Sequence, residues 1–175
     1  MTSLLNRHGA KAIGITGKDA SLLRAKPLKR GKYGRVGKIK KVKGKILKQL
    51  IKDDFIPVIA PIASDKTMGS LNINADLCAS KISANIKAKK IFFLTDTRGI
   101  LDKNGNLLSK LSVKDVENLR KDKTIQGGMI PKVDACLEAL KSGVSSAHII
   151  DGRIEHSILL ELFTDEGIGT IITKD

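Results

Sequence analysis

Aromatic residues and cysteines are scarce in this 175-residue sequence. Phenylalanine, tyrosine and tryptophan together make up 3% of it, and tryptophan does not occur at all. The two cysteines, Cys78 and Cys136, lie far apart and in neither a CxxC nor a Cys/His ligand spacing, so the sequence predicts no zinc site and no other metal site. We expect both to be buried thiols in a reducing compartment.

Long apolar runs are also missing. The longest, Ile56 to Ala63, is interrupted by proline and is too short to cross a bilayer. The first residues, MTSLLNRHGAKAIGI, lack the apolar core of a signal peptide. We therefore expect a soluble, cytoplasmic protein without a membrane partner. Its length fits one domain, or two small lobes that share a sheet, and is sufficient for a substantial core.

Acidic residues are nearly absent from the first 52 positions, which hold 16 Lys and Arg but only one acid, Asp19. The net charge of +14 thus comes from this segment. A basic run from Arg24 to Lys52 raises the alternative of a nucleic-acid-binding module. Only Tyr33 and Phe55 lie in or beside the run, so it offers little surface for base stacking, and its excess of lysine over arginine favours a solvated face. We expect no nucleic-acid partner.

Strands and helices alternate through most of the chain. Residues 21–43 alternate basic and apolar positions around three glycines, which predicts a twisted hairpin. Because parallel strands need crossover helices, the alternation predicts an α/β sandwich with a mainly parallel sheet. The expected strands are 12–15, 56–62, 90–95, 147–150 and 170–173, with a hairpin turn at 102–106. The expected helices are 45–53, 74–88, 113–120, 133–141 and 155–163.

Ligands of such sheets bind where strands end and helices begin, which directs attention to the loops 16–19, 72–76, 95–99 and 124–132. No Walker A motif and no GxGxxG occurs. In the last of these loops Gly127 and Gly128 precede Pro131 and Lys132. We expect Pro131 to occupy the first helical position and Lys132 the first turn. In the first turn a lysine is repelled by the positive end of the helix dipole unless an anion binds there. A phosphoryl group in transfer would be a suitable anion. The alternative is a solvated surface lysine.

Two further segments are candidates. Asn74 suits a helix N-cap and Asp76 the first turn after it. Capping alone would explain both, whereas a functional interpretation has Asn72 donate to a substrate carboxylate and Asp76 orient a cation such as Lys132. The segment Leu94–Leu101 is a polar loop after the central strand, where a nucleotide is expected.

Six segments, taken in order, resemble acetylglutamate kinases of the amino-acid kinase family. They are GITGKDASLL (14–23), SLNINADLCASKI (70–82), FFLTDTRGIL (92–101), IQGGMIPKV (125–133), SAHIIDGR (146–153) and LLELFTDEGIGTII (159–172). The resemblance implies a three-layer α/β/α sandwich and transfer of the ATP γ-phosphoryl group to the γ-carboxylate of N-acetyl-L-glutamate, a step of arginine biosynthesis. Magnesium would arrive with ATP. It also implies a substrate lobe, 1–94, with the basic hairpin, and an ATP-binding lobe, 95–175.

The resemblance also assigns roles to individual residues. Lys132 resembles the lysine that stabilises the phosphoryl group, Asp76 the aspartate that organises catalytic lysines, and Asn72 the asparagine that binds the substrate. The nucleotide-binding positions would be Asp96, Thr97, Arg98, Gly99, Ile100, Leu101, Thr124, Ile125 and Gln126. An arginine effector site, present in some members, would use His148, Glu161 and Gly167.

Family chains carry a further amino-terminal portion, with a catalytic lysine, a glycine-rich loop and a substrate-binding arginine, that has no counterpart here. We expect the isolated chain to be an incomplete kinase: a fragment, half of a split enzyme, or a catalytically inactive remnant that binds nucleotide or regulates a kinase. Removal of part of the sheet would expose an edge. We therefore expect a homo-oligomer, most simply a dimer, or association with the missing half.

Overall fold

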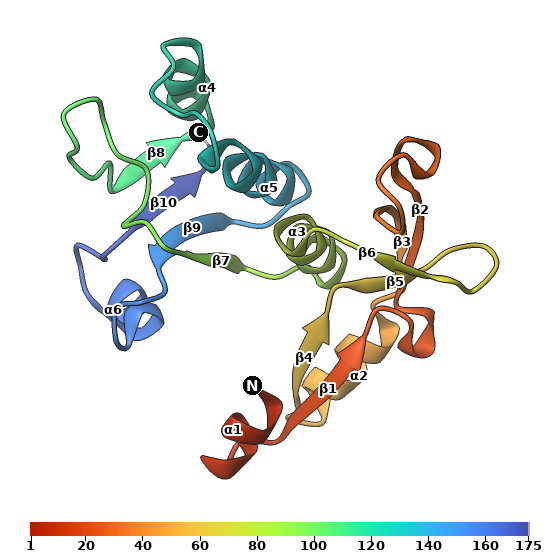
Figure 1. Cartoon of the computed structure of the whole chain (residues 1–175). Coiled ribbons are helices and arrows are strands. Elements are labelled where there is room, and N and C mark those ends of the chain that lie inside the picture. Colours follow the sequence, from red (N-terminus) through yellow and green to blue (C-terminus); the bar gives the residue numbers. More distant parts are fainter. Residues whose placement is uncertain (175) are drawn as a thin grey trace. The chain divides into compact units, whose positions relative to one another are not determined.

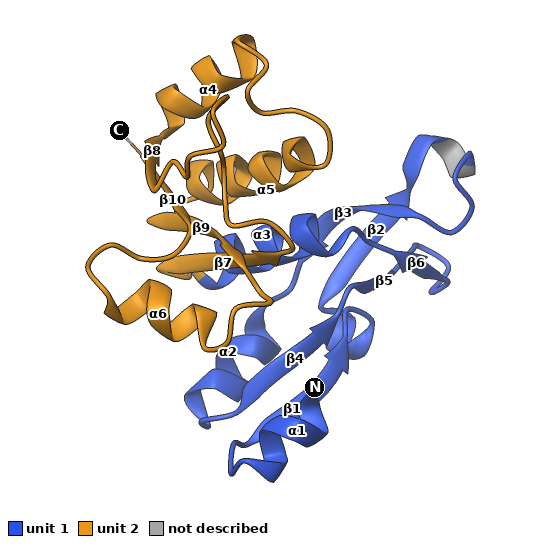
Figure 2. Ribbon diagram, turned by 60° about the vertical axis from the view of Figure 1, so that its left-hand side comes forward, with its two compact units in different colours: residues 1–86 blue, residues 87–175 orange. Residues whose placement is uncertain are grey.

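The computed structural model describes residues 1–174, apart from the side chains of residues 30 and 31 (Figure 1). The chain forms two compact units, Met1–Ile86 and Lys87–Asp175 (Figure 2). The division precedes strand β7, Lys90–Thr95, because β7 pairs with strands of the second unit. The sequence predicts the lobe boundary at the other end of this strand, between residues 94 and 95. The assignment of one lobe to the substrate and the other to ATP stays a prediction.

Unit 1 contains two sheets. Strands β1 (Ala12–Thr16) and β4 (Ile56–Ala60) form a parallel pair, and a four-stranded sheet has the order β3-β2-β5-β6. The remaining elements of the unit are α1 (Thr2–Arg7), η1 (Asp19–Ser21), β2 (Leu23–Pro27), η2 (Leu28–Gly31), β3 (Gly37–Val42), α2 (Lys45–Lys52), β5 (Ile62–Ser64), β6 (Ser70–Asn72) and α3 (Ala75–Ile86). Strands β2 and β3 form the antiparallel hairpin that the sequence predicts.

Proline divides the strand that the sequence predicts over 56–62. Pro61 separates β4 from β5, and these two strands belong to different sheets. Because proline has no N–H to donate to a strand ladder, a break between two strands is expected at Pro61. Helix α2 is also less deeply packed than its pattern indicates, because Leu47 is buried while Ile51 is 48% exposed.

Unit 2 has a mixed four-stranded sheet, in the order β7-β9-β10-β8. Strand β9 (Ser146–Asp151) is parallel to β7 and antiparallel to β10 (Thr170–Thr173), which in turn is parallel to β8 (Lys110–Ser112). Helix α5 (Met129–Lys141) covers one face and α6 (Ser157–Phe163) the other, and α4 (Val113–Lys121) follows β8 (Figures 1 and 2). The three layers and the α/β class are as predicted.

The core of unit 2 lies between the sheet and α5. Every residue of β9 is buried, as expected for a central strand covered on both sides. On the helix, Val133, Cys136 and Leu140 are fully buried at three- and four-residue spacing, so one stripe of α5 faces the sheet. Both cysteines are buried, and burial raises the pKa of the Cys78 thiol to about 11.

A buried polar cluster ties α6 to the sheet. Nδ1 of His148 on β9 lies 2.8 Å from Oε1 of Glu161 on α6, and the two side chains are 3% and 4% exposed. The other carboxylate oxygen of Glu161 accepts hydrogen bonds from the backbone N–H groups of Ile168 and Gly169, at 2.8 and 3.0 Å. Nε2 of His148 lies 2.9 Å from the Ser146 hydroxyl. We call His148 and Glu161, with these partners, the buried clamp.

Within the described residues, no helix is long and apolar enough to cross a membrane. Nor do the described His, Cys, Asp and Glu side chains gather in a group of three that could hold a metal ion.

We predict that the chain self-associates through the β1–β4 pair. Among the described strands neither β1 nor β4 has a second partner, so each presents an open edge. Ile56, which is 46% exposed on β4, should tolerate lysine, and the added charge should lower the average mass measured by light scattering. The matched change Ile51→Lys, on α2, should leave the mass unchanged. A chain that is monomeric at high concentration before any substitution would contradict this prediction.

We also predict that acid destabilises unit 2 through the buried clamp. Burial lowers the pKa of His148, although Glu161 acts in the opposite direction. The folded chain therefore holds this imidazole neutral, while the unfolded chain binds a proton below a pH of about 6.5. Burial by itself would raise the pKa of Glu161, but hydrogen bonds from His148 and the backbone outweigh burial and lower it, so its contribution is lost at still lower pH.

The free energy of unfolding in urea should therefore fall between about pH 7 and 5. His148→Gln should flatten that slope, whereas His156→Asn, at an exposed position with positive φ, should keep it. Equal slopes in the two variants would refute the assignment to the clamp.

Candidate functional site

The turn before α5 presents backbone donors. Gly127 has a φ of +56°, which favours glycine, while Gly128 has an ordinary helical φ of −65°. A Cβ placed on either would meet no atom within 4 Å, and both residues are exposed. Neither N–H donates a hydrogen bond within the described part of the chain. Crowding inside the protein does not explain glycine at 128, whereas close approach of a ligand to this backbone would.

Helix α5 begins two residues before the position that the sequence predicts for it, so Pro131 is its third residue and not its first. The third residue still lies in the first turn, where a missing N–H breaks no helical bond. The N–H groups of Met129 and Ile130 donate to the carbonyls of Gln126 and Gly127, at 3.3 and 3.2 Å. The two glycine N–H groups are therefore the donors that an anion would meet here. Lys132, half-buried, closes the first turn.

The loop after β7 combines exposed and packed residues. Asp96, Thr97 and Arg98 are exposed, whereas Gly99 and Ile100 are buried. Gly99 has a φ of +146°, and a Cβ there would lie 2.6 Å from the Thr170 hydroxyl. This hydroxyl accepts a hydrogen bond from the Ile100 N–H, at 2.8 Å. The loop is thus fixed against β10 at its end, and only its first three side chains and Leu101 reach solvent.

The two stretches predicted to bind nucleotide are connected through neighbouring residues. The carboxylate of Asp122 accepts a hydrogen bond from the Thr124 N–H at 2.9 Å and pairs with Lys103 Nζ at 3.5 Å. Lys103 stands two residues after Leu101, and Thr124 opens the second stretch. Ile125 is buried and Gln126 is exposed. The structure therefore brings residues 96–101 and 124–126 into one region of unit 2.

The same edge of the sheet carries a charged pair, Asp151 and Arg153, from the segment SAHIIDGR (146–153), for which the sequence predicts no role. Thr95 and Asp151, at the carboxyl ends of β7 and β9, are direct neighbours. Asp151 accepts two side-chain hydrogen bonds from Arg153, at 3.0 and 2.8 Å, and this partner lowers the pKa of Asp151 to about 2. The hydrogen bonds to Asp151 raise the pKa of Arg153, and the negative charge of Asp96 adds a smaller effect in the same direction. Spacing alone could have suggested the pair, since the two residues are separated only by Gly152.

Unit 1 holds the other two candidates. Asn72 ends β6 with an exposed side chain, and its N–H donates to the Arg35 carbonyl at 2.7 Å. Asn74 accepts a hydrogen bond from the Leu77 N–H at 3.0 Å, which confirms the cap of α3. Asp76 lies half-buried in the first turn of α3. Asn72 and Asp76 thus lie within unit 1 and Lys132 within unit 2, and their convergence on one substrate stays a prediction.

The three residues proposed as an arginine effector site all belong to the buried clamp or touch it. His148 pairs with Glu161, and a Cβ on Gly167, whose φ is +65°, would lie 2.7 Å from a Glu161 oxygen. The structure brings them together, and within the described chain the Glu161 carboxylate already accepts hydrogen bonds from three partners. Arginine binding at this place stays a prediction.

A profile of the Amino acid kinase family matches residues 1–151. The acetylglutamate kinase of Campylobacter curvus is 60% identical over 172 residues, which cover 98% of this chain and 61% of that protein. A second acetylglutamate kinase, from Campylobacter hominis, is 62% identical, with 99% and 62% covered. The chain therefore spans about three fifths of the length of these curated relatives.

Solved structures support the same fold. The smu.665 protein from Streptococcus mutans UA159 superimposes with a TM-score of 0.83 at 26% identity, and the match covers 99% of this chain and 65% of that one. The resemblance noted in the sequence and the α/β/α architecture are both confirmed: with its first 151 residues matched by the family profile, the chain belongs to the amino acid kinase family.

Proposed function

We propose that this chain is the carboxy-terminal, ATP-binding part of an acetylglutamate kinase, which phosphorylates the γ-carboxylate of N-acetyl-L-glutamate in arginine biosynthesis. The observation that carries the proposal is the identity of about 60%, along nearly the whole chain, to relatives of that name. The activity itself belongs to a longer protein, because the chain spans about three fifths of those relatives. A cytoplasmic location follows from the biosynthetic role that we propose.

The geometry of unit 2 supports the nucleotide side of the proposal. A triphosphate whose outer group lies at the turn before α5 would accept hydrogen bonds from the N–H groups of Gly127 and Gly128 and gain from the helix dipole. Lys132 would add a positive charge to the phosphoryl group as it moves. The residues 96–98 and 124–126 would hold the rest of the nucleotide, with Gly99 and Ile100 contributing backbone only, since their side chains are packed inside.

Residues of unit 1 would bind and orient the acceptor. Asn72 has an exposed amide suited to donate to a carboxylate, and Asp76 would fix the position of a catalytic ammonium. Phosphoryl transfer between two anions requires alignment and positive charge more than covalent chemistry. Magnesium would come bound to ATP, because the described carboxylates form no cluster that could hold the ion by themselves.

A nucleotide-binding remnant is the second candidate. The chain spans about three fifths of the length of those relatives, so an activity of the whole protein need not reside in this part. Such a chain would keep the turn at 127–128 and the affinity for nucleotide but show no turnover. For either candidate, the open edges of β1 and β4 support a homodimer or association with an amino-terminal half. We retain arginine binding at the buried clamp as part of the proposal.

We predict that MgATP binds the isolated chain and that Lys132→Ala weakens the binding about tenfold, as expected for loss of one charge-assisted contact. Calorimetry would measure both dissociation constants. Lys141→Ala, in the last turn of the same helix, removes an equal charge from an exposed position and should bind like the parent. If the two variants bind MgATP equally well, Lys132 does not contact the nucleotide.

We predict that the isolated chain turns over little N-acetyl-L-glutamate in a coupled ADP assay. A fusion with the preceding part of the Campylobacter curvus relative should restore turnover, because that part would complete the positive cradle. Lys132→Ala in the fusion should lower kcat by about two to three orders of magnitude, the scale for loss of one electrostatic contact to the transition state. A fusion that folds and binds MgATP but remains inactive would favour the remnant.

A further inference from the structure

The outer face of the four-stranded sheet in unit 1 carries a basic groove. Along β2, Leu23 and Ala25 point into the core, so Arg24 and Lys26 point to the opposite face. Arg24 pairs across to Ser64 on β5, which places the two side chains next to each other. The groove has a volume of about 380 Å³ and is lined by both of these residues together with Lys26, Lys40 and Lys66. None of the residues assigned to the kinase reaction lines it.

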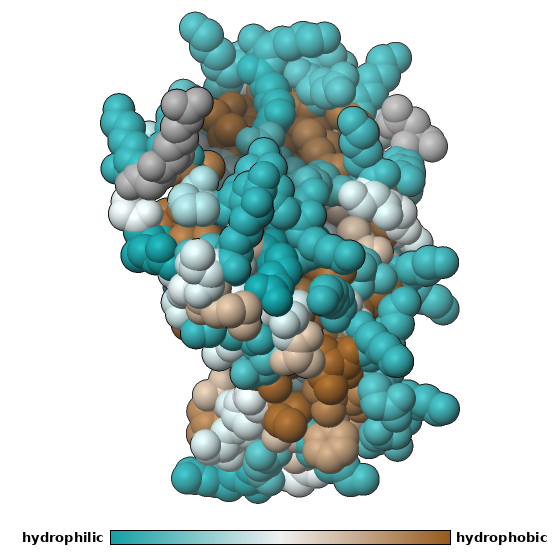
Figure 3. Space-filling view, turned by 90° about the vertical axis from the view of Figure 1, so that its right-hand side faces the viewer, coloured by the Kyte–Doolittle hydropathy of each residue, from teal (hydrophilic) through white to brown (hydrophobic). Residues whose placement is uncertain are grey.

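A larger hollow of about 750 Å³ adjoins the groove. The two share Ala25, Lys26, Asp65 and Lys66 as lining residues, so they form one continuous depression between the hairpin and the turn after β5. The face of the molecule shown in Figure 3 is largely hydrophilic, with apolar surface showing between the polar side chains.

Ser64 is the first sign of a ligand. Its side chain is completely buried, yet its hydroxyl has no hydrogen-bond partner among the described residues. A buried hydroxyl without a partner costs on the order of 1–3 kcal/mol, so native proteins rarely retain one. The residue belongs to the lining of the groove, and a group bound there that accepts a hydrogen bond would satisfy it.

Arg24 is the second sign, because it is half-buried without an acidic partner. Its guanidinium donates to the Asp65 backbone carbonyl at 3.4 Å, to the Met68 sulfur at 2.9 Å and to the Ser21 hydroxyl at 3.3 Å. All three acceptors are neutral, and no described carboxylate forms a salt bridge with this arginine. Its charge is therefore available to an anion in the groove.

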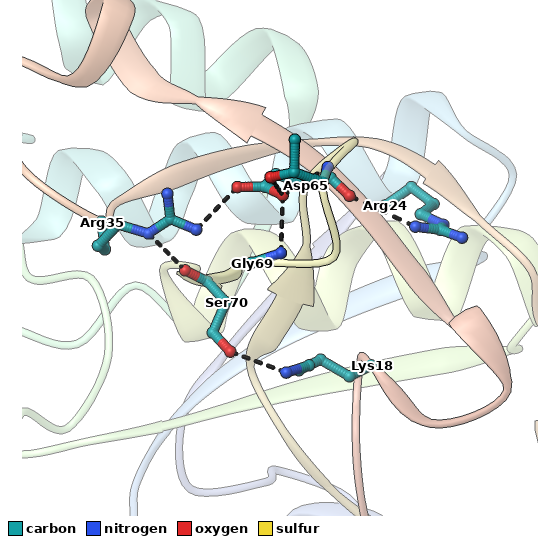
Figure 4. Close-up of polar contacts among 7 residues, drawn as sticks. Lys18, Arg24, Arg35, Asp65, Gly69 and Ser70 are labelled. Atoms are coloured by element: carbon teal, nitrogen blue, oxygen red, sulfur yellow. Dashed lines mark hydrogen bonds and ion pairs between the residues drawn. The ribbon is translucent and has the colours of Figure 1, made fainter.

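Asp65, the one acid in the groove, is already occupied. One of its oxygens accepts from Arg35 at 2.7 Å, and the other accepts from Thr67 and from the Gly69 N–H. These hydrogen bonds, led by that from Arg35, lower the pKa of Asp65 to about 2. Figure 4 shows Arg35 and Arg24 on opposite sides of Asp65, with Arg24 directed to the backbone carbonyl. The carboxylate holds the turn and does not neutralise the cations of the groove.

The three lysines complete a positive field. Lys26, Lys40 and Lys66 are exposed, and none makes an ion pair with a described acid. Their flexible side chains surround the floor formed by Arg24 and Ser64. Cations that converge without counter-charges repel one another, and an anion between them reverses this cost.

We propose that this groove binds a phosphate-bearing small anion, with Arg24 and Ser64 on the floor and the three lysines at the rim. A phosphate group accepts hydrogen bonds from several directions at once, which suits donors on three strands and a turn. The site is separate from the nucleotide site proposed for unit 2 and does not depend on it. Extended nucleic acid fits less well, since within the described residues around the groove there is no aromatic side chain to stack a base.

Residue-resolved NMR on the whole chain tests the proposal. Inorganic pyrophosphate, titrated at physiological ionic strength to screen general attraction, should shift the amide signals of Arg24, Ser64 and Lys66. Any binding at the nucleotide site would appear separately, at Gly127 and Gly128, so the two proposals fail independently. Citrate, a carboxylate of comparable charge, should bind at least about tenfold more weakly if the site selects phosphate.

Three variants distinguish binding at a specific site from attraction by the overall positive charge of the chain. Arg24→Gln should weaken pyrophosphate binding about tenfold and Ser64→Ala about fivefold. Lys48→Gln/Lys52→Gln removes two exposed charges from α2, outside the groove, and should retain the parent's affinity. Ser64→Ala should also leave the urea midpoint unchanged or raise it, because it removes a polar atom that has no partner.

Several results would overturn the proposal. Absence of shifts at residues 24, 64 and 66 would show that the groove is empty of pyrophosphate. Affinity that is unchanged in Ser64→Ala, weaker in Arg24→Gln and weakest in the double lysine variant would show that binding follows net charge alone. Equal affinity for citrate would remove the selectivity for phosphate.

Discussion

The parallel pairing of β7 with β9 is the constraint on which the arrangement of unit 2 depends. It places Thr95 beside Asp151, so the loops that follow both strands leave the sheet at one edge. The antiparallel β10 then fixes the first loop through the Thr170 hydroxyl, which receives the Ile100 N–H. Asp122 brings the turn before α5 to the same region. Without that pairing, Thr95 and Asp151, which lie far apart in the sequence, would not meet at one edge of the sheet.

Acids in this chain mostly hold turns and helix ends. The described aspartates whose pKa is lowered owe the shift mainly to hydrogen bonds from nearby backbone and side chains; they are Asp19, Asp65, Asp102, Asp115, Asp122 and Asp151. Asp115, for example, completes a capping box with Ser112 at the start of α4. The basic character of unit 1 follows from its composition, because its first 52 residues hold 16 Lys and Arg but only one acid.

The sequence predicted the class of the fold, the hairpin, strands β7, β9 and β10 and the cap of α3, since each rests on local periodicity or on a single residue type. It did not predict the three-residue strand β8. It placed the start of α5 too late, because Pro131 is compatible with any of the first positions of a helix. It predicted one strand where Pro61 separates two, because apolar spacing does not say which sheet a strand joins.

The basic groove lay beyond prediction for another reason. Whether Ser64 has a hydrogen-bond partner depends on residues of the neighbouring strand β2, some forty positions away in the sequence, and on the register of the two strands. The neutral acceptors around Arg24 come from turns whose geometry no spacing rule gives. The catalytic assignments, by contrast, came from local sequence together with resemblance, and the structure adds to them the open backbone at Gly127 and Gly128.

The parallel pair of β1 and β4 has a consequence for how the chain acquires its structure. It joins Ala12 to Ile56, positions 44 apart, whereas the hairpin joins Pro27 to Gly37, positions 10 apart. Closing the longer loop loses more chain entropy and slows contact formation, so we expect the hairpin to assemble before the β1–β4 pair. During synthesis both strands of the lysine-rich hairpin also emerge before β4, the partner of β1.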